Sequence, residues 1–384
     1  MDYQKQQRRV TDVAAFYADD YAARQGSMGV PIYQTSIFVP TDPPSGYHYT
    51  RIGNPTFDVG EKKLAEMENG QKAILVTSGM TAISLAVLSC VKSGGHIITL
   101  RNLYPGALGG LFPYLAERFN IETTFVDGKR VEDFEEAIRP NTQLIYLESP
   151  SSYMFEMQDI EEIVRLAKAK GIKTMIDNTW ATPIFQNPLD FGVDLVVHSC
   201  SKYIGGHSDL IGGVIVGSEE IISAISSTER TTFGCVMDPH QAWLVARGLR
   251  TLPVRMEKHM DNGLKVARFL ADHPCIAEVK HPGLPQYAQK KLSEKYLYGY
   301  SSLFAFVTKG TLEQSRQSVE DTAVFNRTVS WGGYDSLLAA FGCGSEESAK
   351  ANYVTPGLIR ISVGLEAPET LMEALDTSLR KYVK

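Results

Sequence analysis

The chain has 384 residues, which is more than one ordinary hydrophobic core accommodates, so its length predicts two domains. Hydrophobic residues make up 43% of it and charged residues 21%, which is enough to bury two cores and is typical of a soluble globular protein. The net charge is −6 and no block of Lys and Arg occurs, so nucleic acid and anionic membranes are poor candidates for partners and small molecules are better ones.

The cysteines indicate a reducing compartment. There are five of them, an odd number, and they are widely scattered without any Cys-x-x-Cys pair. This pattern favours free thiols over a disulfide framework or a structural zinc site. The first 26 residues are too polar for a signal peptide, and no segment offers 18 uncharged apolar residues. We therefore expect a cytoplasmic protein without a membrane partner.

The N-terminal region lacks a lasting hydrophobic period. The stretch PIYQTSIFVPTDPPSGYHYTRIGNPT is rich in Pro, Gly and Tyr. We expect residues 1–50 to form an extended arm. Its aromatic and proline content suggests that the arm docks on a neighbouring subunit, because an isolated arm would be mobile.

From residue 73 onward, short apolar runs alternate with segments of helical period. This alternation predicts a buried α/β sheet with crossover helices. The expected strands are AILVTS (73–78), HIITL (96–100), IETTFV (121–126), QLIYLES (143–149), IKTMID (172–177), DLVVHS (194–199) and GGVIVG (212–217). Ligands of such sheets bind at the carboxyl ends of the strands, so the polar residues at those ends deserve most weight as site candidates.

After residue 235 the pattern changes to long helical segments followed by a few strand-like runs. The runs SSLFAFVTKG (301–310) and RISVGL (360–365) resemble strands, and a helix is expected after them. We therefore expect a large α/β domain over 51–235 and a smaller α+β domain over 236–384.

Lys202 stands just after one of the expected strands. Ser199, Ser201, Gly205 and Gly206 surround it. A lysine held at a strand end among neutral groups can have a lowered pKa, and a neutral amine is the form that makes a Schiff base. A solvated loop lysine is the common alternative for any single lysine. The order of residues does not fit a P-loop or a dinucleotide-binding glycine pattern.

The segment TSGMTAIS (77–84) predicts a strand, a turn and then a helix. The backbone amides of Gly79 and Met80 and the helix dipole would then point at one place, where a phosphate could bind. An ordinary turn with Ser78 as the helix N-cap accounts for the same residues.

Asp177 ends another expected strand and is followed by Asn-Thr-Trp. A carboxylate at this place can bind a metal, cap a helix or accept a hydrogen bond from a protonated ring nitrogen. No HExxH motif, cysteine pair or carboxylate cluster accompanies it, so we expect no metal.

Together these motifs resemble a known family. The segments are YTRIGNPT (49–56), SGM (78–80), Tyr104, ESP (148–150), IDNTW (176–180), HSCSKYIGGHSD (198–209) and RISVGLE (360–366). In order and spacing they are similar to the Cys/Met-metabolism (trans-sulfuration) family of enzymes that depend on pyridoxal 5'-phosphate (PLP). The resemblance covers nearly the whole chain.

This resemblance implies the PLP-dependent transferase fold of type I, with a seven-stranded, mostly parallel sheet. It also implies a homotetramer, a dimer of dimers whose active sites are shared across the dimer interface. Lys202 would carry the cofactor and move protons at the substrate carbons. Asp177 would keep the cofactor's ring nitrogen protonated.

By the same resemblance, further residues would bind the cofactor phosphate and the substrate. The phosphate would lie among Ser78, Gly79, Met80, Ser199 and Ser201, with Tyr49 and Arg51 reaching it from the adjacent subunit. Tyr104 would stack on the cofactor ring and serve as an acid or base; a structural aromatic residue is its alternative. Arg360 would bind the substrate carboxylate as a fork, and a surface ion pair is its alternative.

The reaction type is less sharply indicated. Ser152 and Trp331 resemble the bacterial cystathionine β-lyases, and Val329, ahead of Ser330, lacks the charge that would pair with a distal ammonium. The arm motif around Tyr49 instead resembles γ-type members. We expect a cystathionine β-lyase, with γ-elimination or γ-replacement as alternatives, and an aminotransferase or an inactive cofactor-binding scaffold as remoter ones.

Overall fold

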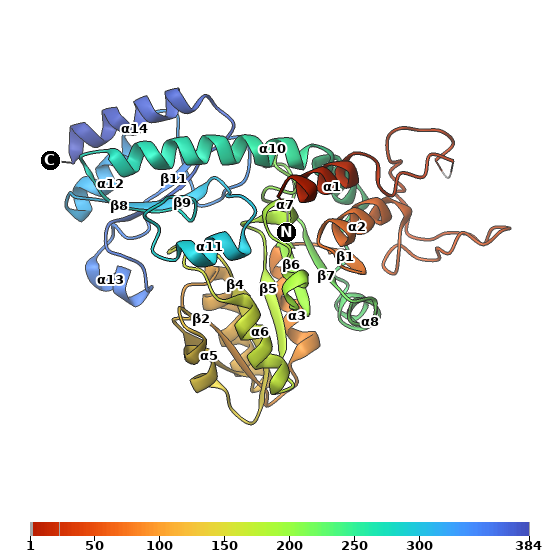
Figure 1. Ribbon diagram of the computed structural model, residues 1–384. Coiled ribbons are helices and arrows are strands. Elements are labelled where there is room, and N and C mark those ends of the chain that lie inside the picture. The colour runs from red at the N-terminus through yellow and green to blue at the C-terminus, as the bar shows by residue number, and fades with distance from the viewer. Residues whose placement is uncertain (1–2, 23, 384) are drawn as a thin grey trace.

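The computed structural model describes residues 3–22 and 24–383. Residues 1, 2 and 23, within the expected arm, and residue 384, the last of the expected C-terminal domain, lie outside the described part. Two sheets and the helices around them make up the fold (Figure 1).

A seven-stranded sheet lies at the centre of the larger part of the molecule. The strands are β1 Lys72–Val76, β2 His96–Leu100, β3 Glu122–Val126, β4 Thr142–Glu148, β5 Lys173–Asp177, β6 Leu195–Ser199 and β7 Gly213–Gly217. Their order is β1-β7-β6-β5-β4-β2-β3, and β7 runs antiparallel to both of its neighbours while the other pairs are parallel. The predicted seven-stranded, mostly parallel sheet is confirmed, and each expected run overlaps one strand.

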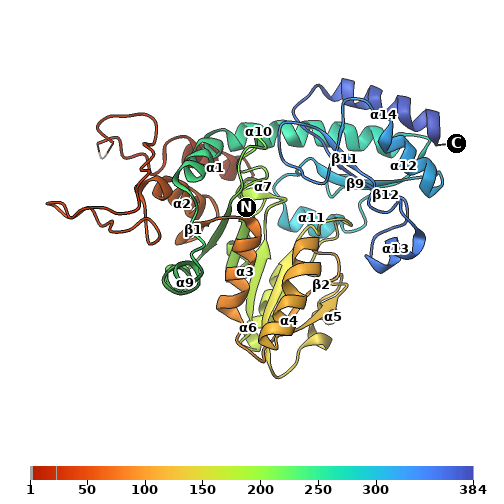
Figure 2. The same ribbon diagram turned by 180° about the vertical axis from the view of Figure 1, so that it is seen from behind.

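Helices cover both faces of this sheet (Figures 1 and 2). They are α2 Pro55–Met67, α3 Gly79–Cys90, α4 Phe112–Phe119, α5 Val131–Ala137, α6 Ile160–Ala169, α7 Thr182–Phe185, α8 Glu219–Ile225 and α9 Thr231–Phe233, with single turns at Ala107–Leu111, Pro188–Phe191 and Ser226–Arg230. Apart from the edge strand β3, the strands are mostly buried. This double cover explains why they are continuous apolar runs in the sequence rather than alternating ones.

A second sheet of five strands follows in the chain. Its strands are β8 Ile276–Lys280, β9 Leu303–Thr308, β10 Asn326–Arg327, β11 Leu337–Ala339 and β12 Leu358–Ser362, in the order β10-β11-β12-β9-β8. The accompanying helices are α11 Lys290–Tyr296, α12 Leu312–Glu320, α13 Glu346–Ala351 and α14 Pro368–Tyr382. The expected strand run RISVGL (360–365) overlaps β12, which begins two residues earlier, so Arg360 lies inside the strand and not at its start.

The long helix α10 Pro239–Asp272 joins the two parts (Figure 1). Its first half contributes Leu249 and Met256 to the hydrophobic core of the large sheet. Its second half contributes Val266 and Leu270 to the core between the small sheet and α14. One rigid helix is therefore built into both cores.

The expectation of an extended arm from residue 1 is wrong for its beginning. Tyr3–Phe16 form helix α1, which packs against α2 and α10. Gln6, Val10, Val13 and Ala14 are buried, and this spacing is the apolar stripe of a helix. The composition of the Pro- and Tyr-rich segment that follows obscured that stripe. Residues 31–54 contain no helix. Tyr33 and Asn54 tie the two ends of this segment to Thr56 of α2, and the chain between them extends away from the body (Figure 1).

Among the residues that the structure describes, no helix has both the length and the apolar composition needed to cross a bilayer.

The packing of α1 is tested by truncating one buried side chain. Val10→Ala removes two carbon atoms from a fully buried position and should lower the free energy of unfolding by about 1.5–2.5 kcal/mol. Thr11→Ala, at an exposed position of the same helix, should change it by less than about 0.5 kcal/mol. Urea unfolding followed by circular dichroism measures both, and equal effects would contradict the docking of α1.

Candidate active site

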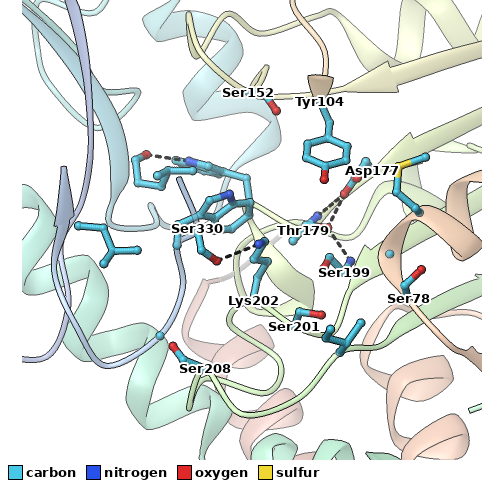
Figure 3. A pocket seen from close by; sticks show the side chains of 18 of the residues that line it. Ser78, Tyr104, Ser152, Asp177, Thr179, Ser199, Ser201, Lys202, Ser208 and Ser330 are labelled. Carbon is cyan, nitrogen blue, oxygen red and sulfur yellow. Dashed lines mark hydrogen bonds between the residues drawn. The ribbon is translucent and has the colours of Figure 1, made fainter. Parts of the chain in front are cut away.

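A cavity of 530 Å³ opens at the carboxyl ends of β4, β5 and β6. Parallel pairing sets Glu148 of β4 beside Asp177 of β5, and β6 delivers Ser199 at the same edge. Eleven of the residues expected at the site line this cavity: Ser78, Gly79, Met80, Tyr104, Ser152, Asp177, Ser199, Ser201, Lys202, Ser330 and Trp331. Figure 3 shows most of them around Lys202.

Lys202 lies in the turn that follows β6, and its amine projects into the cavity (Figure 3). Lys202 Nζ donates a hydrogen bond of 3.0 Å to Ser330 Oγ and lies 5.7 Å from the centroid of the Trp331 ring. Burial lowers the pKa of Lys202, the positive charge of Arg360 lowers it further, and the charge of Asp177 opposes both. The lowered pKa that the sequence suggested is thus confirmed in direction, and it favours the neutral, nucleophilic amine.

Asp177 ends β5 with one carboxylate oxygen already engaged. Its Oδ1 accepts hydrogen bonds from the backbone N–H and the hydroxyl of Thr179. Burial raises the pKa of Asp177, whereas the bonds from Thr179 and the charges of His198 and Lys202 lower it. A carboxylate held in this way can accept a hydrogen bond from a cationic group through its second oxygen.

Thr179 is a residue whose role sequence reasoning missed. Besides bonding Asp177, its hydroxyl accepts a hydrogen bond of 2.8 Å from the backbone N–H of Ser199, so it ties the end of β5 to the end of β6. The sequence does contain a pattern that predicts this contact, because an aspartate side chain often accepts a hydrogen bond from the residue two positions later, and here that residue carries a hydroxyl.

The N-terminus of α3 faces the same cavity. Ser78 caps this helix, since its side chain accepts a hydrogen bond from the backbone N–H of Thr81. The amides of the first turn have no partner inside a helix, so they and the dipole can hold an anion. A Cβ atom at Gly79 would lie 2.8 Å from Ser199 Cβ, so only glycine lets α3 approach β6 this closely. Capping and anion binding are therefore compatible here.

Glu148 is a buried acid at the back of the cavity. Oε2 of its carboxylate accepts a hydrogen bond of 2.9 Å from the backbone N–H of Tyr104, and Oε1 accepts one from the hydroxyl of Ser152. Burial and the charge of Asp177 raise the pKa of Glu148 to about 8, although these hydrogen bonds and the charge of Arg360 act in the other direction. Ser152 was expected to contact the substrate, and in the structure its hydroxyl bonds Glu148.

Arg360 lies on β12 beside the cavity but does not line it. Its guanidinium stacks on the rings of Phe341 and Tyr153, at 4.6 and 5.4 Å from their centroids, and donates to the backbone carbonyl of Val329. Burial lowers the pKa of Arg360. The stacking orients the planar fork, which is the geometry that a carboxylate requires.

Three more of the expected site residues do not line the Lys202 cavity. Tyr49 and Arg51 line a separate cavity, where the guanidinium lies 5.4 Å from the centroid of the tyrosine ring. The side chain of Val329 is 65% exposed and does not line the Lys202 cavity. Tyr49 and Arg51 are therefore not brought to Lys202 within a single chain, and Val329, although next to Ser330, has its side chain turned to the surface.

Two polar residues that the sequence did not single out complete the cavity wall. Asp335 lines it, and its Oδ1 accepts a hydrogen bond of 3.3 Å from the hydroxyl of Ser208, which also lines it (Figure 3). No ion pair of Asp335 occurs among the described residues. Over residues 3–22 and 24–383, no group of three or more His, Cys, Asp or Glu side chains is arranged to hold a metal ion.

Comparisons with known proteins match the whole length of the chain. The family model described as "Cys/Met metabolism PLP-dependent enzyme" matches residues 13–380. An L-methionine gamma-lyase of Porphyromonas gingivalis is 37% identical over 375 residues, covering 93% of this chain and 94% of that one. A cystathionine beta-lyase of Lactococcus lactis subsp. cremoris is 35% identical over 365 residues, covering 93% and 95%.

A solved structure agrees with these sequence matches. The crystal structure of cystathionine gamma synthase from Xanthomonas oryzae pv. oryzae superposes with a TM-score of 0.91 at 30% identity, covering 97% of this chain and 98% of that chain. The fold of type I inferred from the sequence motifs is confirmed.

The raised pKa of Glu148 predicts a pH-dependent stability. The folded state keeps a proton up to about pH 8 that the unfolded chain releases near pH 4.5, so this stabilisation is complete below pH 4.5 and is lost as the pH rises to about 8. Between pH 5 and pH 8 the free energy of unfolding of the wild type should therefore fall relative to that of Glu148→Gln. Urea unfolding at a series of pH values measures this difference.

The control is Glu136→Gln, which changes an exposed glutamate in the same way. Its pH profile should run parallel to that of the wild type. If the Glu148→Gln profile also ran parallel, the elevated pKa would be refuted.

Proposed function

The chain belongs to the family of Cys/Met metabolism PLP-dependent enzymes, and from this premise we propose that it is a carbon–sulfur lyase that cleaves cystathionine by β-elimination. The family's cofactor is pyridoxal 5'-phosphate. Its relatives include γ-lyases and β-lyases of sulfur amino acids, so the reaction within the family has to be argued from this chain's own residues.

The residues of the cavity fit this cofactor. PLP has an anionic phosphate, a ring nitrogen that takes a proton, and an aldehyde. The amides at the start of α3 with the hydroxyls of Ser199 and Ser201 suit the phosphate, the carboxylate of Asp177 suits the protonated nitrogen, and the amine of Lys202 suits the aldehyde. When bound, the cofactor supplies an electron sink that acidifies the Cα–H bond of an amino acid.

In this proposal the protein groups bind the substrate and move the proton. Arg360 binds the substrate α-carboxylate as a fork, and its stacking on Phe341 and Tyr153 supports that orientation. The neutral amine of Lys202 removes the proton from Cα, which a lowered pKa favours. The ring of Tyr104 lines the cavity opposite Lys202 (Figure 3), and there it would stack on the cofactor ring.

The confinement of Lys202 Nζ is the observation that carries the choice of β-elimination. The amine is held between Ser330 Oγ and the Trp331 ring. β-Elimination requires one proton, taken from Cα, before the bond between Cβ and sulfur breaks. γ-Elimination requires a second proton, from Cβ, so its base must reach two carbon atoms. A base restrained on two sides supports the single abstraction.

γ-Elimination is the second candidate, and the similarity to an L-methionine gamma-lyase favours it. Replacement at Cγ, which would make this a synthase, is favoured only by the likeness to a cystathionine gamma synthase. Both differ from β-elimination in the products that they release.

The arm supports a shared active site. Ile37, Val39 and Ile52 on it are 60% or more exposed, and Tyr49 and Arg51 lie away from the chain's own Lys202. We propose that each arm docks on a neighbouring copy and brings Tyr49 and Arg51 to the phosphate there, in a homotetramer built from two such dimers.

Asp335 supports cystathionine as the substrate. The far end of cystathionine carries an ammonium group, which methionine lacks. Asp335 offers the cavity a carboxylate without a cationic partner among the described residues, and this is the charge that Val329 does not provide. An ammonium at the far end of the substrate would pair with it.

Product analysis tests the reaction. From cystathionine, β-elimination with hydrolysis yields homocysteine, pyruvate and ammonia, whereas γ-elimination yields cysteine, 2-oxobutyrate and ammonia. We expect pyruvate and homocysteine in equal amounts; 2-oxobutyrate as the main keto acid would replace the proposal by its second candidate. Lys202→Ala should lower the rate by at least about 10²-fold, because it removes the base.

The role of Asp335 is tested by substrate preference. Asp335→Asn should lower the ratio of kcat/KM for cystathionine to kcat/KM for S-ethylcysteine, which has sulfur on Cβ but no distal ammonium, by about 10- to 100-fold, which is the value of a hydrogen bond to a charged group. Asp209→Asn changes an exposed aspartate on the neighbouring loop that does not line the cavity, and it should leave this ratio unaltered. If Asp335→Asn had the same ratio of kcat/KM values as Asp209→Asn, the pairing of Asp335 with the substrate ammonium would be refuted.

A further inference from the structure

Arg255 is a buried cation on α10 whose partners are all neutral. Its side chain is 7% exposed and makes no ion pair among the described residues. Nη1 donates 2.6 Å to the carbonyl of Tyr203, and Nη2 donates 2.8 Å to that of Gly248 and 3.3 Å to that of Ile204. Nε donates 3.1 Å to the hydroxyl of Thr251. Arg255 thus joins α10 to the two residues that directly follow Lys202.

These two carbonyls belong to the turn that carries Lys202. The turn closes on itself through the backbone, from Gly205 N–H to the carbonyl of Cys200 and from Gly206 N–H to the carbonyl of Lys202, both at 2.8 Å. Gly206 has φ +73°, and a Cβ atom there would lie 2.0 Å from Arg255 Nη1. The guanidinium and the turn therefore leave no space between them, and neither can shift alone.

The charge makes this contact specific to one conformation of the turn. A cation removed from water is costly unless fixed dipoles surround it, and here three backbone carbonyls supply those dipoles. Burial lowers the pKa of Arg255 to about 10, which reflects the missing counterion. A displaced turn would remove the carbonyls of Tyr203 and Ile204 and leave Nη1 without an acceptor, so the electrostatic cost opposes such a displacement.

The same helix supports the turn at a second point. His259, one helical turn after Arg255, places its ring 4.9 Å from the ring of Tyr203, edge to face. Its Nδ1 lies 3.0 Å from Ser302 Oγ, the hydroxyl to which Tyr203 also hydrogen-bonds. α10 therefore contacts the residues after Lys202 through Arg255 and His259. Inside the cavity, Ser330 and Trp331 contact the amine of Lys202.

We propose that Arg255 is a positioning residue for Lys202: it fixes the turn from which the lysine reaches the cofactor and to which the free amine returns. The inference rests on the proposed role of Lys202. During a reaction cycle the amine must leave the cofactor when substrate binds and attack it again when product leaves. A fixed Cα position keeps that second attack within reach, because small displacements of a reacting group cost large factors in rate.

The test measures attachment of PLP without any substrate. PLP is removed from the purified protein and added back, and the growth of the visible absorbance band of the lysine-bound form gives the rate of attachment. Borohydride reduction followed by peptide mass spectrometry identifies the lysine that was labelled. Arg255→Met should attach PLP about 10- to 100-fold more slowly than the wild type.

Arg230→Met is the matched control. Arg230 is also buried, at 2% exposure, but it lies 3.8 Å from Glu61 and over the Phe57 ring instead of beside the Lys202 turn. Both variants should have a lowered Tm, and only Arg255→Met should be slow in attachment. Attachment by Arg255→Met at the Arg230→Met rate would overturn the inference, because the residue would then serve stability alone.

Arg255→Lys gives a second test in a variant that keeps the charge. One ammonium cannot reach the carbonyls of Tyr203, Ile204 and Gly248 in the same geometry as the fork, so we expect slow attachment here too, intermediate between Met and Arg. A wild-type rate in Arg255→Lys would also overturn the inference. Labelling of a lysine other than Lys202 in the wild type would refute both the proposed role of Lys202 and this inference. If only the lyase assay failed, the expected rates of PLP attachment would be unchanged, and the inference would stand.

Discussion

The parallel register of β4, β5 and β6 is the constraint on which the rest of the site depends. It places Glu148 beside Asp177 and sets Ser199 and the Lys202 turn at the same edge. A shift of one residue in any of these strands would turn the terminal side chain to the opposite face of the sheet. Thr179 reinforces the register, since it bonds both Asp177 and the backbone of Ser199.

Burial then divides the charges of this edge into different chemical roles. Two carboxylic acids and two cations share one weakly solvated region, and burial is the largest influence on the pKa of all four: Glu148, Asp177, Lys202 and Arg360. It raises the pKa of the acids and lowers that of the cations, so each group moves toward its neutral form. The amine of Lys202 gains nucleophilicity in this way, whereas the guanidinium of Arg360 remains a cation because its ordinary pKa is so high.

Helix α10 gives these groups a common support. It is part of both hydrophobic cores, and it contacts the backbone after Lys202 through Arg255 and the ring of Tyr203 through His259. Movement of the small sheet, which carries Arg360, relative to the large sheet would therefore act on the lysine turn as well. The arm has no such support over residues 31–54, and its exposed apolar side chains are consistent with docking on another copy.

The sequence by itself determined the seven strands, the mostly parallel sheet, the cofactor family and eleven of the residues that line the Lys202 cavity, because apolar runs and short motifs are local patterns that need no knowledge of distant contacts. Only the tertiary structure decided which side chains meet. It directs the hydroxyl of Ser152 to Glu148 and turns Val329 to the surface, and it brings Asp335 to the cavity and Arg255 beneath the lysine turn. These contacts join residues up to 127 positions apart, and their burial and electrostatics exist only once the two sheets and α10 have packed.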